Sequence, residues 1–232
     1  MCNRYRPVSV VRYRDIFGFT YIESGPQRPW RAAIGPLQDG PFIRAGGLAV
    51  GQWGLIPDRS RTRKPTLPNG KPMSTNNARF GAGEPEKAVF RGPWSRGQRC
   101  LVLAEDYDEP YWGTGKNIWW RFARADGMPW TLAGLWNEWT DPATGEVVAS
   151  YTMLTINCDA HPLLSLMHKP DPALPPDRQD KRSVVSIERE HWDAWLHGSP
   201  AEAAALIRLA PVACFRHSAA EPAQQVDLPL RS

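Results

Sequence analysis

Proline is the residue that most limits how this chain can fold. The 232 residues contain 23 prolines, and they occur along the whole length. A proline ring removes a backbone donor and breaks the interior of a helix or of a central strand. We therefore expect many short elements joined by stiff loops, and not a helical bundle.

Stretches rich in apolar, β-branched and aromatic residues mark the expected strands. Residues 48–57 form one, which a proline ends, and residues 99–104 form a second. Residues 130–139 and 147–157 are two further strand-like runs. They are joined by Asp-Pro-Ala-Thr-Gly at 141–145, which predicts a β-hairpin.

Three short helices are expected from start and stop signals. Residues 85–91 form the first, which the following Gly-Pro pair stops. Residues 187–197 form the second, which ends at Gly198. The third opens at Ser199, with proline at the first helical position and Glu202 placed to complete a capping box.

The remaining segments are mostly loops. Residues 9–22 fit either a strand or a short helix, whereas 58–76 and 169–182 are long, polar and rich in proline. Loops of that length are usually functional or disordered. We predict one α+β, β-dominated domain over residues 1–217, followed by a loose tail over 218–232.

Positive charge is concentrated in the first part of the chain. Residues 1–100 hold 17 Lys and Arg against 6 Asp and Glu, whereas the other 132 hold 11 against 18. The basic residues include Arg4, Arg6 and a run at 59–64. Such a patch suits a polyanion, because neutralising phosphates releases counterions. Charge alone favours the alternative, a solvated basic loop.

Tryptophan and cysteine usage narrows the class of protein. The 11 tryptophans serve equally well in a core or in stacking on nucleic-acid bases. The four cysteines are widely spaced and form no CxxC pair, so neither a disulfide framework nor a zinc site is predicted. The first twenty residues lack an apolar signal core, and no apolar run is long enough to span a membrane. We expect a cytoplasmic monomer that needs no metal or organic cofactor.

Cys2 is the residue with the most distinctive chemistry. Removal of Met1 would leave a terminal cysteine with a free α-amine, whose ordinary pKa of about 7.7–8.0 leaves part of it neutral and nucleophilic. The amine can condense with an aldehyde to an imine, and the thiol can then close a thiazolidine ring. The same thiol can instead attack a carbonyl in hydrolysis. By position alone, an inert cysteine remains the more common case.

Five short segments together resemble the SOS response-associated peptidase (SRAP) family. They occur in the family's order and spacing across roughly residues 1–185, and the combination is far more specific than any one of them. They are Met-Cys-Asn-Arg-Tyr at 1–5, Trp-Gly-Leu-Ile-Pro at 53–57, Asn-Ala-Arg at 77–79, Arg-Cys-Leu-Val-Leu-Ala with the following acidic run at 99–109, and Ser-Leu-Met-His at 165–168.

The resemblance implies a fold and a covalent reaction with abasic sites in single-stranded DNA. The fold would have a curved, barrel-like antiparallel sheet at its core, with flanking helices. The crosslink would be a thiazolidine on the ring-opened sugar, formed after self-removal of Met1 and shielding the lesion. The residues that carry these roles in the family correspond here to Cys2, Asn77, Glu109 and His168, with Arg4 and Arg79 holding DNA phosphates.

Each implied role suits its side chain. Cys2 would form the covalent bond, and Asn77 would position the amine or the sugar hydroxyls. Glu109 would serve the acid–base steps of imine formation, and His168 would move the proton that opens the sugar ring, since imidazole titrates near neutrality. Tyr107, Tyr111 or Trp112 would stack on DNA bases.

The sequence departs from the family pattern at several points, and two other functions remain open. Asn3 stands where the family has glycine, the glutamate expected soon after Asn77-Ala78-Arg79 is absent, and an insert at 169–181 displaces the arginine-methionine-proline expected after His168. The alternatives are a general cysteine peptidase or amidohydrolase that uses Cys2 with His168, and a noncovalent single-stranded DNA-binding module.

Overall fold

The computed structural model describes residues 2–17 and 30–220. Strands dominate this part of the chain. They are β1 (Tyr5–Pro7), β2 (Asp39–Arg44), β3 (Gly47–Trp53), β4 (Asn77–Gly81), β5 (Glu84–Pro85), β6 (Arg99–Tyr111), β7 (Ile118–Arg124), β8 (Trp130–Thr140), β9 (Val147–Asn157), β10 (Arg182–Val184) and β11 (Phe215–Ala219).

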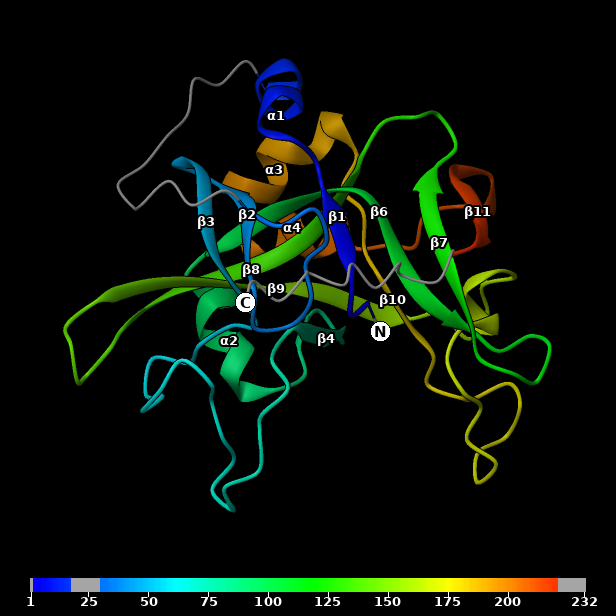
Figure 1. Cartoon of the computed structure of the whole chain (residues 1–232), viewed down its shortest axis with the longest axis horizontal. Helices are drawn as coiled ribbons and strands as arrows, with labels where there is room; N and C mark the ends of the chain where they lie inside the picture. Colours follow the sequence, from blue (N-terminus) through cyan, green and yellow to red (C-terminus); the bar gives the residue numbers. More distant parts are fainter. Residues whose placement is uncertain (1, 18–29, 221–232) are drawn as a thin grey trace, which may run out of the picture.

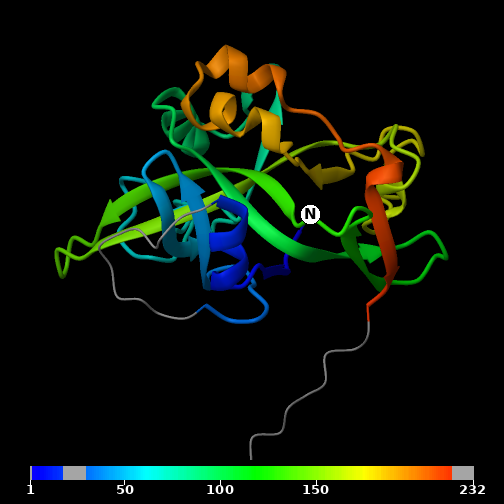
Figure 2. The same ribbon diagram turned by 90° about the horizontal axis from the view of Figure 1, so that it is seen from above.

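The helices are all short, as the proline content predicts. They are α1 (Val10–Phe17), α2 (Ala88–Ser95), α3 (Trp192–His197) and α4 (Pro200–Ala205), with 3₁₀ turns η1 (Leu164–Leu166), η2 (Arg189–His191) and η3 (Val212–Cys214). Figure 2 shows α2, α3 and α4 gathered over one side of the sheet. No helix in the described ranges is long and apolar enough to cross a membrane.

The sheet closes on itself through five strands. β6 pairs with β2, β2 with β3, β3 with β9, β9 with β8, and β8 with β6 again. The pairs are antiparallel except for β3–β9 and β4–β9, which are parallel. The predicted α+β class with a curved, barrel-like sheet is therefore confirmed, with two parallel pairs added to an otherwise antiparallel sheet (Figure 1).

Further strands extend the sheet beyond these five. β1 and β7 lie on either side of the second half of β6, β11 adds to β7, and β4 and β10 pair with β9. The two long loops, 58–76 (cyan) and 169–181 (yellow), project from the same side of the molecule in Figure 1.

Alternation along β6 divides the interior into two cores. Leu101 and Leu103 point into a core that includes the helical tryptophans Trp94 and Trp195. Cys100 and Val102 point to the opposite side, into a core that also contains Cys2. Because successive side chains of a strand face opposite ways, one strand serves both cores.

The predicted hairpin and the predicted capping box are both confirmed. β8 and β9 pair in register on either side of the turn at 141–145. Ser199 accepts from the Glu202 backbone N–H, and the Glu202 side chain accepts from the Ser199 N–H. Residues 10–17 of the ambiguous segment form a helix, while the rest of it, 18–22, lies outside the described residues.

Both limits predicted for the first helix, 85–91, are wrong. It begins at Ala88 and runs through the Gly-Pro pair to Ser95. A proline inside a helix removes one backbone hydrogen bond and costs about 3 kcal/mol. The helix continues because its buried face, Phe90, Pro93 and Trp94, packs against the core, with Trp94 at 5.0 Å from the ring of Phe80.

Other elements also begin or end at residues that differ from those predicted from the sequence. β3 ends at Trp53, because Gly54 takes a φ of 133° that turns the chain away from the sheet. α3 begins only at Trp192, after a 3₁₀ turn. β11 carries Ser218 and Ala219, assigned above to the tail, into pairing with β7. Residues 221–232 of that tail lie outside the described part of the chain.

Candidate active site

Cys2 lies at the centre of a buried polar cluster. Its side chain is fully buried, and its thiol lies 3.5 Å from the carbonyl oxygen of Arg4. The Asn77 side-chain N–H donates to the Cys2 carbonyl oxygen at 2.8 Å. The Asn77 Oδ1 atom is buried and accepts no hydrogen bond from any described residue. An acceptor is thus available beside Cys2.

The Trp-Gly-Leu segment fixes Asn77 in this place. The indole N–H of Trp53 donates to the carbonyl of Asn76, and the backbone N–H of Met153 donates to the same oxygen. Asn77 then begins β4, directly opposite Met153 in β9. The basic loop therefore ends at a rigid anchor, and Asn77 emerges from that anchor toward Cys2.

Glu109 and His168 form the second half of the cluster. Glu109 is buried in β6, and the Nε2 atom of His168 lies 3.1 Å from its Oε2 atom. The backbone N–H of His168 donates to Pro110 at 2.7 Å, which sets the loop beside the strand. His168 has a φ of 62°, in the left-handed region that few residues other than glycine adopt.

Burial and nearby charges shift the pKa values of Cys2 and Glu109 in opposite directions. Burial raises the pKa of the Cys2 thiol well above its usual value, and the negative charge of Glu109 raises it further. Burial also acts to raise the pKa of Glu109. The positive charge at the chain's amino terminus and the hydrogen bond from His168 outweigh that effect, so the Glu109 pKa is lowered. The resting site thus holds a neutral thiol beside an ionised carboxylate.

The structure brings together four of the six predicted site residues, namely Cys2, Asn77, Glu109 and His168. The two predicted phosphate contacts lie at the margin, and each is engaged with an acid. Arg4 is 3.0 Å from the buried carboxylate of Asp108, and Arg79 is 2.7 Å from Asp180. Both arginine side chains are more than one third exposed, so they remain accessible to a phosphate.

A family model described as "SOS response associated peptidase (SRAP)" matches residues 1–223. The chain belongs to this family. The match extends over the barrel, the cluster around Cys2 and all four helices.

Two curated relatives carry the name abasic site processing protein HMCES. The protein from Xenopus tropicalis is 31% identical over 149 residues, which cover 55% of this chain and 41% of that protein. The protein from Gallus gallus is 28% identical over 143 residues, covering 53% and 40%. The matches therefore span about two fifths of the length of these relatives.

Solved structures of bacterial proteins share the fold. A protein from Bordetella bronchiseptica superposes with a TM-score of 0.78 at 31% identity, covering 95% of this chain and 100% of that one. A protein from Bacteroides thetaiotaomicron gives a TM-score of 0.69 at 20% identity over 94% and 91% of the two chains, which shows the likeness of the fold alone.

Asn3 was noted in the sequence as a departure from the family pattern, whereas two other residues near the SRAP site, Cys158 and Lys181, were not anticipated. Asn3, at the position of the family glycine, accepts from the Asn76 side chain at 3.0 Å, so the substitution is held in place. Cys158 is buried, and burial followed by the charge of Glu109 raises its pKa to about 12. Lys181 is buried where the insert ends, and its ammonium group donates to the carbonyl of His168. No sequence pattern marks Cys158 or Lys181.

The fold neutralises much of the basic first half. Arg6 pairs with Asp106 and Asp108, and Arg121 lies 3.4 Å from the same Asp108. Arginines at positions 12, 44 and 79 also pair with acids from the second half of the chain. Within the described residues, four cations of the loop 58–76 make no ion pair: Arg59, Arg61, Lys64 and Lys71.

The aromatic residues divide between core and edge. Tyr107 is 1% exposed, so the expectation that it stacks on a base is wrong. Tyr111 is half-buried and lies against Trp120, with ring centroids 3.9 Å apart, and His217 stacks on the far side of Trp120. Trp53, Trp130, Trp139 and Trp195 serve the interior. No group of three His, Cys, Asp or Glu side chains in metal-ligating arrangement occurs in the described ranges.

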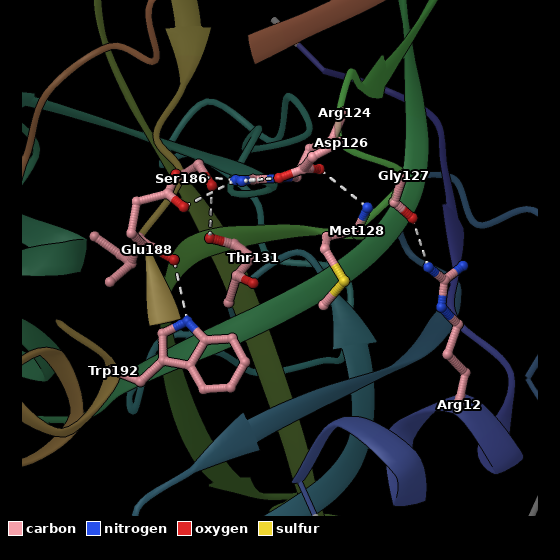
Figure 3. A network of polar contacts seen from close by, with 10 residues as sticks. Arg12, Arg124, Asp126, Gly127, Met128, Thr131, Ser186, Glu188 and Trp192 are labelled. Atoms are coloured by element: carbon pink, nitrogen blue, oxygen red, sulfur yellow. Dashed lines mark hydrogen bonds and ion pairs between the residues drawn. The ribbon is translucent and has the colours of Figure 1, made fainter. Parts of the chain in front are cut away.

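A second polar cluster lies away from Cys2 and is drawn in Figure 3. Arg124 of β7 donates to Asp126 at 2.7 Å and to Glu188 at 2.9 Å. Trp192 donates to the Ile187 carbonyl, and Arg12 of α1 donates to the Gly127 carbonyl (Figure 3). We call Arg124, Asp126 and Glu188 the peripheral network, which ties β7 to the segment that precedes α3.

Proposed function

We propose that this SRAP protein processes abasic sites by forming a covalent thiazolidine between Cys2 and the sugar aldehyde in single-stranded DNA. The observation that carries the proposal is the convergence of three buried residues, Cys2, Asn77 and Glu109, with the partly exposed His168. The name of the curated relatives supports the same lesion as substrate.

Met1 must be removed first. Hydrolysis of the Met1–Cys2 peptide bond consumes one water, releases methionine and frees the Cys2 amine. Asn77 holds the Cys2 carbonyl oxygen, so the residue stays in place when the bond before it is cut. Its buried Oδ1 atom then has an N–H of the new amine, or a sugar hydroxyl, to accept from.

The amine, and not the thiol, acts first. A thiol whose pKa is raised by burial and by Glu109 contributes little thiolate at neutral pH. The amine nitrogen therefore attacks the aldehyde carbon, and loss of water gives an imine. The sulfur then adds to the imine carbon while its proton passes to nitrogen. One aldehyde and one aminothiol thus give one thiazolidine and one water.

Glu109 and His168 supply the proton transfers. An abasic sugar is mostly a closed hemiacetal, so ring opening needs a group that exchanges a proton near neutral pH. The imidazole of His168 carries both a donor and an acceptor nitrogen for this transfer, and Glu109 orients it at 3.1 Å. Glu109, ionised at rest, can take the proton that the amine loses as it attacks the aldehyde, and can return it to the hydroxyl group that leaves as water. Arg4 and Arg79 provide charge for the flanking phosphates.

The test is a denaturing gel of the protein with single-stranded DNA that carries one abasic site. Wild type with Met1 removed, verified by intact mass, should give an adduct that survives heat and detergent. Cys2→Ala should give none, and neither should a protein with an extra residue ahead of Cys2. Cys214→Ala is the matched control, because Cys214 is the one partly exposed thiol among the described residues, and it should crosslink normally.

The two alternatives predict different results. A noncovalent DNA-binding module would bind intact and abasic strands alike and would leave no adduct on the denaturing gel. A general peptidase or amidohydrolase would turn over peptides or amides without DNA and would lose that activity on Cys2→Ala. Absence of an adduct from fully processed wild type would overturn the proposal.

A further inference from the structure

Lys181 contacts the backbone of the candidate active site and takes no part in the proposed crosslinking reaction. It is the last residue of the insert 169–181 and is 6% exposed. Its ammonium group donates to the backbone carbonyl of His168. The contact therefore joins the two ends of the insert at the residue that carries the catalytic imidazole.

The backbone of His168 needs such support. Its φ of 62° is disfavoured for a residue with a β-carbon, and it persists where the surroundings enforce it. The His168 N–H is bound to Pro110 at 2.7 Å, and the His168 carbonyl is bound by Lys181. Both polar groups of this peptide segment are thus fixed, and the side chain is aimed at Glu109.

Lys181 is itself held rigidly to the end of β9. Its backbone N–H donates to the carboxylate of Asp159 at 2.8 Å, and its carbonyl accepts from the N–H of Cys158 at 2.8 Å. Cys158 directly follows the last residue of β9. The lysine therefore connects the end of β9 to the backbone of His168.

The burial of this ammonium group is costly and is not offset by an ion pair. Burial lowers the pKa of Lys181, the nearby Cys158 and Asp159 oppose that shift only in part, and Lys181 forms no ion pair with an acid of the described residues. A buried lysine without a carboxylate partner is rare in proteins. Buried charges of this kind are expected mainly at functional sites.

We propose that Lys181 is a positioning residue that holds His168 against Glu109 during crosslinking. This inference rests on the proposed function. The insert replaces the segment that follows the histidine in the family pattern, and Lys181, at the far end of the insert, contacts His168.

The experiment compares single-turnover crosslinking rates at saturating abasic single-stranded DNA. Lys181→Met keeps most of the volume and removes the donor, and its rate should fall about 10- to 100-fold, the loss expected when a reacting group is misplaced by about 1 Å. Lys181→Arg keeps a charged donor and should return the rate to within a few-fold of wild type. Arg178→Met, on the exposed part of the same insert, is the matched control and should react normally.

A double-mutant cycle with His168→Asn separates positioning from general destabilisation. If Lys181 acts through His168, Lys181→Met should cause no further loss in the His168→Asn background. It should also change the pH dependence of the rate in the same way as His168→Asn does. A purely structural role would instead lower the rate equally in both backgrounds.

The failures of the two proposals are distinguishable. If wild type forms no adduct, the proposed function fails. If wild type forms an adduct and Lys181→Met matches its rate, only the role of Lys181 is overturned. Should Lys181→Met not fold, the same cycle with Lys181→Gln removes the ammonium group with a smaller loss of polar contact, and an unchanged rate there overturns the role equally.

Discussion

The cluster around Cys2 and the peripheral network both contain carboxylates, but the polar groups of the two clusters have their hydrogen-bonding partners to different degrees. In the peripheral network, the donors of Arg124 meet two carboxylates whose side chains are 49% and 36% exposed. Around Cys2 the groups are buried, the thiol is neutral, and the Asn77 oxygen accepts no hydrogen bond from the described residues.

The difference separates stability from function. A charged group whose partners are complete and partly hydrated contributes to folding and offers little to a ligand. A buried polar atom without a partner costs folding free energy, and that cost is recovered when a substrate supplies the missing contact. Variants of the two clusters should therefore affect different quantities.

The largest expected effect is on the reaction rate. Glu109→Gln should lower the single-turnover crosslinking rate about 10²- to 10⁴-fold, the usual contribution of a general acid or base. DNA affinity, measured by fluorescence anisotropy with intact strands, should stay within a few-fold of wild type. A variant that crosslinks at the normal rate would remove Glu109 from the mechanism.

A smaller effect is expected on folding. Arg124→Met should lower the free energy of unfolding by about 1–2 kcal/mol, because it removes hydrogen bonds to two carboxylates in a partly exposed site. Chemical denaturation measures this loss. The crosslinking rate of the folded variant should equal that of wild type, and a parallel loss of rate would show that the two regions are coupled.

The smallest effect is the pH dependence of stability that Glu109 contributes. Its folded pKa lies below the ordinary value of about 4.3, so its ionised form stabilises the native state above that pH. The contribution is lost as the pH falls from about 4.3 through the lower folded value. The difference in unfolding free energy between wild type and Glu109→Gln should be constant near neutrality and shrink below pH 4.3. A difference that grows on acidification would contradict the lowered pKa.

Local signals predicted some elements and failed at others for identifiable reasons. The turn at 141–145 and the Ser199 capping box depend on neighbouring residues, so the sequence was sufficient. The acidic run 105–109 was not expected to be a strand, yet it continues β6 because β1 and β7 pair with it. Partners that distant in sequence leave no periodic signal. Packing of Trp94 likewise outweighed the Gly-Pro pair that precedes it.

The sequence by itself determined the kinds of chemistry available and their order along the chain. A cysteine after Met1, an asparagine after a basic loop, and a glutamate and a histidine in family spacing were sufficient to predict which side chains meet, and the four do lie together. The prolines predicted many short elements and no helical bundle, and the resemblance to the SRAP family predicted the barrel-like sheet.

Only the tertiary structure decided which charges remain available and how the site is supported. An ion pair between Arg4 and Asp108, or between Arg79 and Asp180, joins residues about one hundred positions apart, and its formation depends on strand pairing. The same holds for Lys181, whose contact with His168 exists because the insert folds back onto the end of β9. Coulomb and hydrogen-bond energies depend on distance in space, which the order of residues does not fix.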